Sequence, residues 1–168
     1  MNMNTEEKIG LSWKEKMAAW VVLVIGIGYL LLQVVNLLSS KSAGYTATNG
    51  ALVISKAELF SDLKTYFYIL TGIIGGILLL KAKKIGWIIS VPYLLIFTVL
   101  ASWGMLFSIK MHTYGSLAFL AVVWILLLLS LFFLLRREGS KKFRVSKTTV
   151  LPTLAFLILI IVLYFFLQ

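Results

Sequence analysis

The side chains that could do chemistry gather toward one end of a series of long apolar runs. Gln33 and Asn36 follow Tyr29 at i+4 and i+7, so all three share one face of a helix. Thr98 and Ser102 repeat this i, i+4 spacing. We hypothesise an outward-facing cavity for a lipid headgroup, a peptide or a small neutral polar molecule. The candidate residues of this cavity are Tyr29, Gln33, Asn36, Asp62, Thr98, Ser102 and His112, with Asp62 or His112 at its rim.

The same polar residues have a second interpretation. Gln, Asn, Ser and Thr side chains in apolar helices commonly hydrogen-bond to a neighbouring helix, and each such bond contributes about 0.6 kcal/mol. This packing role is the more ordinary of the two. Whether the polar side chains line a cavity or join helices therefore stays open.

Catalytic and metal-binding chemistry is poorly represented in the sequence. The chain has one histidine, His112, and no cysteine. A general base needs an orienting partner, and none can be assigned to His112. No ionisable residue lies in the middle of an apolar run, which counts against a proton-coupled pump. We therefore expect no catalytic residues, no metal site and no cofactor.

The elements that must position these residues are membrane-spanning helices. The sequence is 61% hydrophobic with a mean hydropathy of +1.00, whereas soluble domains are about 45–50% apolar. The apolar residues form continuous runs, which is typical of helices in lipid. We predict an all-α integral membrane protein, a single five-span helical bundle formed by residues 1–168. The predicted spans are 17–38, 57–80, 85–109, 115–135 and 150–167.

The basic residues predict the orientation of this bundle. Sixteen Lys and Arg are present, and twelve of them fall in the segments 1–16, 81–86 and 136–149. Lys and Arg beside spans are retained on the cytoplasmic side. We therefore expect the N-terminus and the segments 81–86 and 136–149 on the cytoplasmic side, and the C-terminus on the outside. The membrane is expected to be a bacterial inner membrane.

The segment 136–147 carries six of these cations between two apolar runs. Besides fixing topology, it is expected to contact anionic lipid headgroups or an acidic partner, with about 1 kcal/mol from each cation near the surface. The net charge of +10 is interpreted in the same way, and not as binding of nucleic acid. The predicted contact residues are Arg136, Arg137, Lys141, Lys142, Arg144 and Lys147.

Local patterns predict several structural details. Ser12 with Glu15, and Ser55 with Glu58, have the spacing of capping boxes that open helices. In such a box the serine hydroxyl accepts a hydrogen bond from a backbone N–H of the first turn, and the glutamate carboxylate accepts one from the serine backbone N–H. The second of these helices is expected to continue unbroken to residue 80.

Three further residues concern helix packing and shape. Gly72 and Gly76 let a neighbouring helix approach closely, within the bundle or in a dimer, and the former is favoured. Pro92 is expected to kink the third span. In the external loop, Asn49-Gly50 between short β-prone runs has the pattern of a type I′ turn and predicts a β-hairpin over 45–54.

Three function classes remain. The first, which fits best, is a non-catalytic accessory or interaction subunit of a membrane complex, bound to a membrane protein or to copies of itself. The second is an oligomeric channel or transporter for a small molecule. The third is a protein that binds or modifies lipid in the outer leaflet, which requires Asp62 and His112 to converge.

Overall fold

The structure is a computed structural model that describes residues 10–42 and 56–166. Within those two ranges all regular secondary structure is helical. The hairpin predicted for 45–54 lies outside the described residues. The helices are α1 (Trp13–Ser42), α2 (Lys56–Leu80), α3 (Lys84–Lys110), α4 (Tyr114–Leu135), α5 (Arg137–Lys142) and α6 (Lys147–Phe166).

Four of these helices contain stretches long and apolar enough to cross a membrane, in α1, α2, α3 and α4. The helical, membrane-type bundle predicted from the sequence is thereby confirmed. The apolar part of α6, Lys147–Leu163, is shorter. The count of five spans therefore stays a prediction. The short helix α5 was not expected, because its polar sequence resembles a loop.

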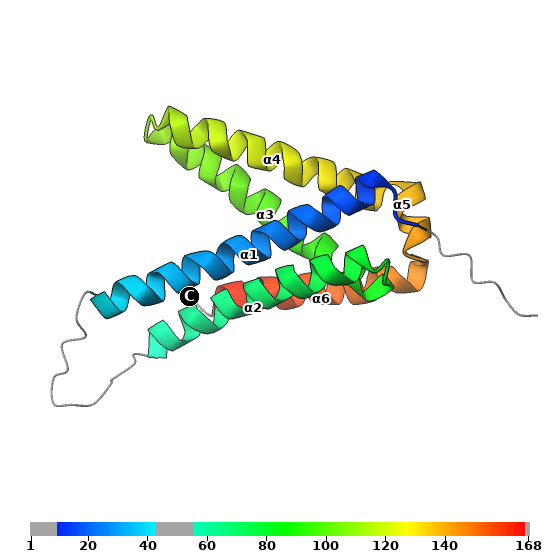
Figure 1. Cartoon of the computed structure of the whole chain (residues 1–168), viewed down its shortest axis with the longest axis horizontal. Helices are drawn as coiled ribbons and strands as arrows, with labels where there is room; N and C mark the ends of the chain where they lie inside the picture. The colour runs from blue at the N-terminus through cyan, green and yellow to red at the C-terminus, as the bar shows by residue number, and fades with distance from the viewer. Residues whose placement is uncertain (1–9, 43–55, 167–168) are drawn as a thin grey trace, which may run out of the picture.

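Helix α3 occupies the centre of the bundle. It packs along α4 and also contacts α2 and α6, while α1 packs along α2 and reaches α4. Figure 1 shows the α3–α4 pair diverging from the α1–α2 pair toward the α3–α4 turn. At the opposite end, the start of α1, the α2–α3 turn and α5 come together (Figure 1). We call this the α5 end of the bundle.

Glycines bring α1 and α2 into close contact. A Cβ atom on Gly72 would lie 2.8 Å from the Cα of Gly26, too close for any real side chain. One turn further along α2, a Cβ on Gly76 would lie 2.8 Å from the Cβ of Leu23. Gly72 and Gly76 therefore lie in an interface within the bundle, where their missing side chains set the separation of the two helices.

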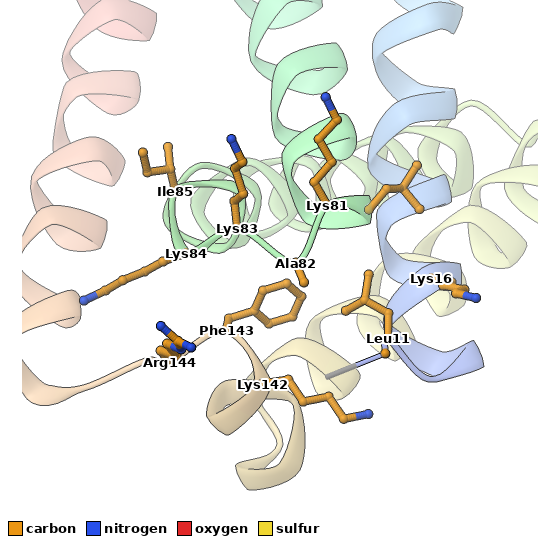
Figure 2. Close-up of a pocket in the computed structure, with 12 residues that line it drawn as sticks. Leu11, Lys16, Lys81, Ala82, Lys83, Lys84, Ile85, Lys142, Phe143 and Arg144 are labelled. Carbon is orange, nitrogen blue, oxygen red and sulfur yellow. The ribbon is translucent and has the colours of Figure 1, made fainter. Parts of the chain in front are cut away.

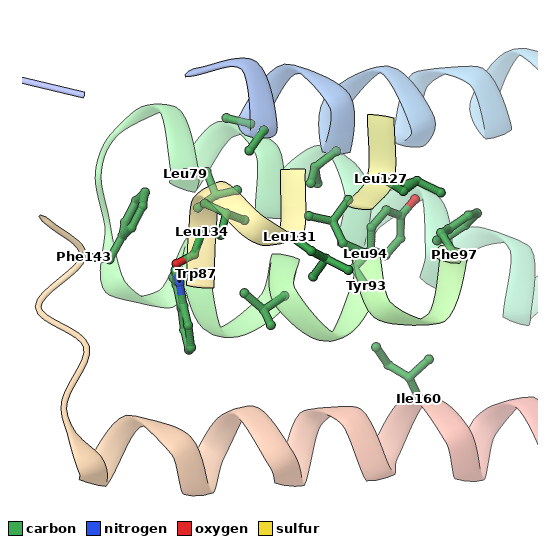
Figure 3. Packing of buried hydrophobic residues seen from close by; sticks show 14 of the residues in the cluster. Leu79, Trp87, Tyr93, Leu94, Phe97, Leu127, Leu131, Leu134, Phe143 and Ile160 are labelled. Atoms are coloured by element: carbon green, nitrogen blue, oxygen red, sulfur yellow. Dashed lines mark hydrogen bonds between the residues drawn. The ribbon is translucent and has the colours of Figure 1, made fainter. Parts of the chain in front are cut away.

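The core surrounds the middle of α3, where the five consecutive residues 90–94 are all buried. Tyr93, Leu94 and Phe97 are buried against leucines of α4, as Figure 3 shows. At the α5 end, the indole N–H of Trp87 donates to the carbonyl oxygen of Leu134 at 3.0 Å. Carbonyls in the last turn of a helix lack an intrahelical partner, so Trp87 satisfies one at the end of α4. Pro92 is fully buried within α3, which remains one helix; a kink there stays a prediction.

Candidate functional site

The polar candidates of α1 lie in different environments. Gln33 is buried, with 8% of its surface exposed. Tyr29 is half-buried, and its ring meets Phe97 of α3 edge-on with 5.4 Å between the ring centroids. Asn36 is exposed. The shared helical face is thus only partly covered by the rest of the bundle.

The hydroxyls of Thr98 and Ser102 are both hydrogen-bonded, and one of these bonds joins two helices. The Thr98 hydroxyl donates to the Leu94 carbonyl at 2.7 Å, and the Ser102 hydroxyl donates to the Thr98 carbonyl at 2.8 Å. The Ser102 oxygen also accepts the indole N–H of Trp124 at 2.9 Å, which joins α3 to α4. This geometry favours the packing interpretation for Ser102, whereas the bond of the Thr98 hydroxyl stays within α3.

His112 and Asp62 lie in different parts of the bundle, the α3–α4 turn and helix α2. His112 is exposed in the α3–α4 turn. Asp62 lies in the first half of α2, and its side chain is outside the described part of the structure. Figure 1 shows the α3–α4 turn well apart from the start of α2. The polar rim on which the outer-leaflet hypothesis depends is therefore without support from the described residues.

The α5 end contains a different candidate, a cleft of about 820 Å³ between three segments of the chain. Figure 2 shows that these segments are the start of α1, the α2–α3 turn and the end of α5. None of the described residues that line it is acidic. Its cations are Lys16, Lys81, Lys83, Lys84, Lys142 and Arg144. We call this the cationic cleft.

Apolar residues also line the cationic cleft. Leu11, Leu80 and Ile85 line it together with Phe143. The Phe143 ring is fully buried and lies beside Ala82 of the α2–α3 turn (Figure 2). Phe143 thus couples the segment after α5 to the α2–α3 turn, which places cations distant in sequence around one cleft.

One of the six cations is neutralised by an ion pair. Lys142 Nζ lies 3.2 Å from Glu15 Oε2, and the Glu15 side chain is only 5% exposed. Within the described residues the other five cations form no ion pair. Because none of the described lining residues is acidic, a bound anion would supply the counter-charge that these cations lack.

Glu15 also shows how the predicted capping box forms. Its carboxylate accepts the Ser12 backbone N–H at 2.7 Å, so the glutamate reaches back as predicted. The expected amide bond to the Ser12 hydroxyl is not what the structure has, because that hydroxyl donates to the same carboxylate oxygen. Glu15 precedes the apolar run that begins at Met17. Burial alone would raise the pKa of Glu15, but the bonds from Ser12 and Lys142 outweigh it and lower the pKa.

Two turns of the cationic cleft have an unusual backbone. Ala82 and Arg144 have φ angles of 53° and 52°, in the left-handed region. Each follows the last turn of a helix in a Schellman motif, with Lys83 N–H bonded to Leu78 O and Val145 N–H to Ser140 O, both at 2.9 Å. Glycine usually occupies this position, because any other residue costs about 1–2 kcal/mol there. Arg144 therefore adopts this backbone at a cost in stability.

The predicted contact residues are only partly brought together. Lys142 and Arg144 line the cationic cleft. Arg136 instead pairs with Glu138 at 3.4 Å on the surface. The remaining three, Arg137, Lys141 and Lys147, are exposed outside the cleft.

Sequence reasoning did not select four of the cations of the cleft. These are Lys16, Lys81, Lys83 and Lys84. Their signal was present, because each lies in one of the short basic segments next to an apolar run. The sequence alone did not show that those segments meet at the α5 end of the bundle.

The arrangement suits recognition of an anion more than chemical transformation of a substrate. Ammonium and guanidinium groups bind phosphate and carboxylate oxygens by charge-assisted hydrogen bonds. The first turn of α3 adds to this, since its N-cap residue Lys83 makes no side-chain capping bond and helix N-termini favour negative charge. Comparison with known proteins gives no further guidance: no protein-family model, no curated protein and no solved structure matches the chain.

Proposed function

We propose that this chain is a non-catalytic multi-span protein of a bacterial inner membrane, and that it acts as an accessory or interaction subunit by binding an anionic group on the cytoplasmic side. The observation that carries the proposal is the cationic cleft, which six Lys and Arg residues from three segments line together. The anionic group belongs to a partner subunit or to surrounding lipid.

The proposal includes five spans with the N-terminus inside and the C-terminus outside. Helix α6 supports the fifth span, because its 20 residues extend about 30 Å, close to the thickness of the hydrocarbon core. The common location of the start of α1, the α2–α3 turn and α5 supports the orientation (Figure 1). These are the basic segments that the positive-inside rule assigns to the cytoplasmic face.

The location of the charges favours specific binding over a general topological role. Topology alone requires basic residues near the ends of spans, but it does not require them to line one cavity. Three cations come from a single short turn, and Arg144 occupies a position that glycine would fill with less strain. Both features suggest that cation positions, and not only cation number, matter.

Gentle detergent extraction from the native host tests the proposal. Wild-type protein is compared with Lys83→Gln/Lys84→Gln, which removes two charges from the cleft. The matched control is Arg137→Gln/Lys141→Gln, which removes two exposed charges of the same face outside it. Mass spectrometry of retained proteins and lipids should show an anionic component that is lost only from the cleft variant. Equal retention in all three preparations would rule out the cleft as the binding site.

A further inference from the structure

The lining of the cationic cleft indicates what kind of anion it takes. Between the cations lie Leu11, Leu80, Ile85 and Phe143, so a ligand that fills the cavity must present apolar surface as well as negative charge. A free inorganic anion would leave these side chains uncovered. Ile85 is 58% exposed and available to such a ligand.

A second cavity lies farther along α3, the helix whose first turn contributes Lys84 and Ile85 to the cationic cleft. It is a groove of about 430 Å³ between α3 and α6, and every residue that lines it is aliphatic. Leu95 and Val99 contribute from α3, and Leu157 and Ile161 from α6. We call it the α3–α6 groove.

The two cavities lie in line on α3. Ile85 of the cationic cleft precedes Ile96 and Val99 of the groove by eleven and fourteen residues, spacings that return to the same face of a helix. The near end of the groove, Leu95, is about 15 Å along the helix from Ile85. One leaflet of a membrane has about the same depth, half of a core of about 30 Å.

The second helix of the groove also begins at the cationic cleft. Arg144 lines the cleft, and α6 starts three residues later at Lys147. Figure 2 shows the Lys84 side chain extending toward this start of α6. Lys84 and Arg144 of the cleft therefore stand at the starts of the two helices, α3 and α6, that form the groove.

We infer that the two cavities form one site for a phosphate-bearing lipid of the inner leaflet, with its headgroup in the cationic cleft and an acyl chain extending toward the α3–α6 groove. This inference rests on the proposed function, and it names the ligand class of the same site. Phosphate fits the cations and the uncapped start of α3, while the aliphatic groove fits the acyl chain.

Native mass spectrometry of the purified full chain tests the headgroup half of the site. Phosphatidic acid is the charged probe, and phosphatidylcholine is the zwitterionic control lipid. Lys83→Gln/Lys84→Gln should lower retention of phosphatidic acid about thirtyfold, the equivalent of about 2 kcal/mol for two cations. Arg137→Gln/Lys141→Gln should leave it unchanged. Equal effects of the two double variants would overturn the inference.

A groove variant tests the acyl-chain half. Val99→Trp fills the α3–α6 groove from a position that is 66% exposed, so the fold should tolerate it. Val122→Trp is the control at a 59% exposed position of α4 outside the groove. We expect Val99→Trp alone to lower retention of phosphatidic acid about tenfold and to leave binding of glycerol phosphate unchanged. Circular dichroism and thermal unfolding verify that each variant is folded.

Soluble probes separate failure of the lipid inference from failure of the proposed function. If glycerol phosphate or inorganic phosphate displaced phosphatidic acid completely and Val99→Trp had no effect, the site would bind free phosphate. The lipid inference would then be wrong, while anion binding by the cleft would stand. If no anionic probe depended on Lys83 and Lys84, both proposals would fail.

Discussion

Lys142 and Glu15 form an ion pair at 3.2 Å although they are 127 positions apart in the chain. The pair joins the first turn of α1 to the last residue of α5, so it fixes one edge of the cationic cleft. Glu15 also accepts the Ser12 amide, which makes one carboxylate both a helix cap and a tertiary contact.

Glu15→Gln should destabilise the protein by about 1–3 kcal/mol, because it removes charged hydrogen bonds from a nearly buried group and leaves Lys142 without its counter-charge. The temperature of half-unfolding in detergent measures the effect. Glu138→Gln is the matched control, since its pair with Arg136 is exposed and should contribute at most about 0.5 kcal/mol. Similar shifts for both variants would contradict a special role for Glu15.

The lowered pKa of Glu15 predicts a loss of stability in acid. A carboxyl group whose pKa is lower in the folded state stabilises the fold fully above its unfolded pKa and loses this contribution as the pH falls through the folded value. The wild type should therefore lose stability below the ordinary glutamate value of 4.5. Unfolding temperatures from neutral pH downward should fall less steeply for Glu15→Gln. Parallel curves for the two proteins would show that another group is responsible.

Trp87→Phe should destabilise the α5 end of the bundle by about 0.5–1.5 kcal/mol, the net contribution of one hydrogen bond. The substitution keeps an aromatic ring but removes the N–H donated to the Leu134 carbonyl, which then keeps only the Ser140 hydroxyl at 3.2 Å as a donor. Trp103→Phe is the control, because Trp103 is 74% exposed. Thermal unfolding should separate the two variants clearly, and an unchanged Trp87→Phe protein would mean that the hydrogen bond contributes little.

Gly72→Ala should separate α1 from α2. The added Cβ would lie 2.8 Å from the Gly26 Cα and 2.7 Å from the Tyr93 hydroxyl, and relief of such overpacking costs about 1–3 kcal/mol. Gly28→Ala provides the contrast within α1, because a Cβ there meets nothing within 4 Å. That variant should be neutral or more stable by up to about 1 kcal/mol. If Gly72→Ala and Gly28→Ala lowered the unfolding temperature equally, the loss of stability would not come from the contact between α1 and α2.

Arg144→Gly and Ala82→Gly should have the same effect on stability but different effects on binding. Both relieve a left-handed backbone and should stabilise the fold by about 1 kcal/mol. Arg144→Gly also removes a cation from the cleft, so retention of phosphatidic acid should fall, whereas Ala82→Gly should retain it. Unfolding and native mass spectrometry on the same samples measure both quantities. If Arg144→Gly kept its lipid, the cation at position 144 would have no part in binding.

The long helices could be predicted because their signals are local. Helix α3 begins at Lys84 and α4 ends at Leu135, where basic residues interrupt continuous apolar runs. The reach of Glu15 back to Ser12 is local in the same sense, since it spans three residues. Helix α2 also runs unbroken from Lys56 to Leu80, as predicted. The capping box predicted for Ser55 and Glu58 lies outside the described part of the structure.

The site could not be predicted because it depends on contacts between distant segments. The bond from Trp124 to Ser102, which favours a packing role, requires the register of α4 against α3. The cationic cleft requires the buried Phe143 ring beside Ala82, which is a contact between segments distant in the sequence. The left-handed backbone at Ala82 and Arg144 could not be predicted either, because such positions are usually recognised from a glycine and neither residue is one.

The burial of Phe143 beside the α2–α3 turn has a consequence for biosynthesis. Ribosomes extend a chain at about 5–20 residues per second, so the roughly sixty residues that separate this turn from Phe143 take several seconds to make. During that interval α1 and α2 can already pair through Gly26 and Gly72, while the three lysines of the turn still lack their aromatic support. The cationic cleft can therefore form only after the chain has been extended to Phe143.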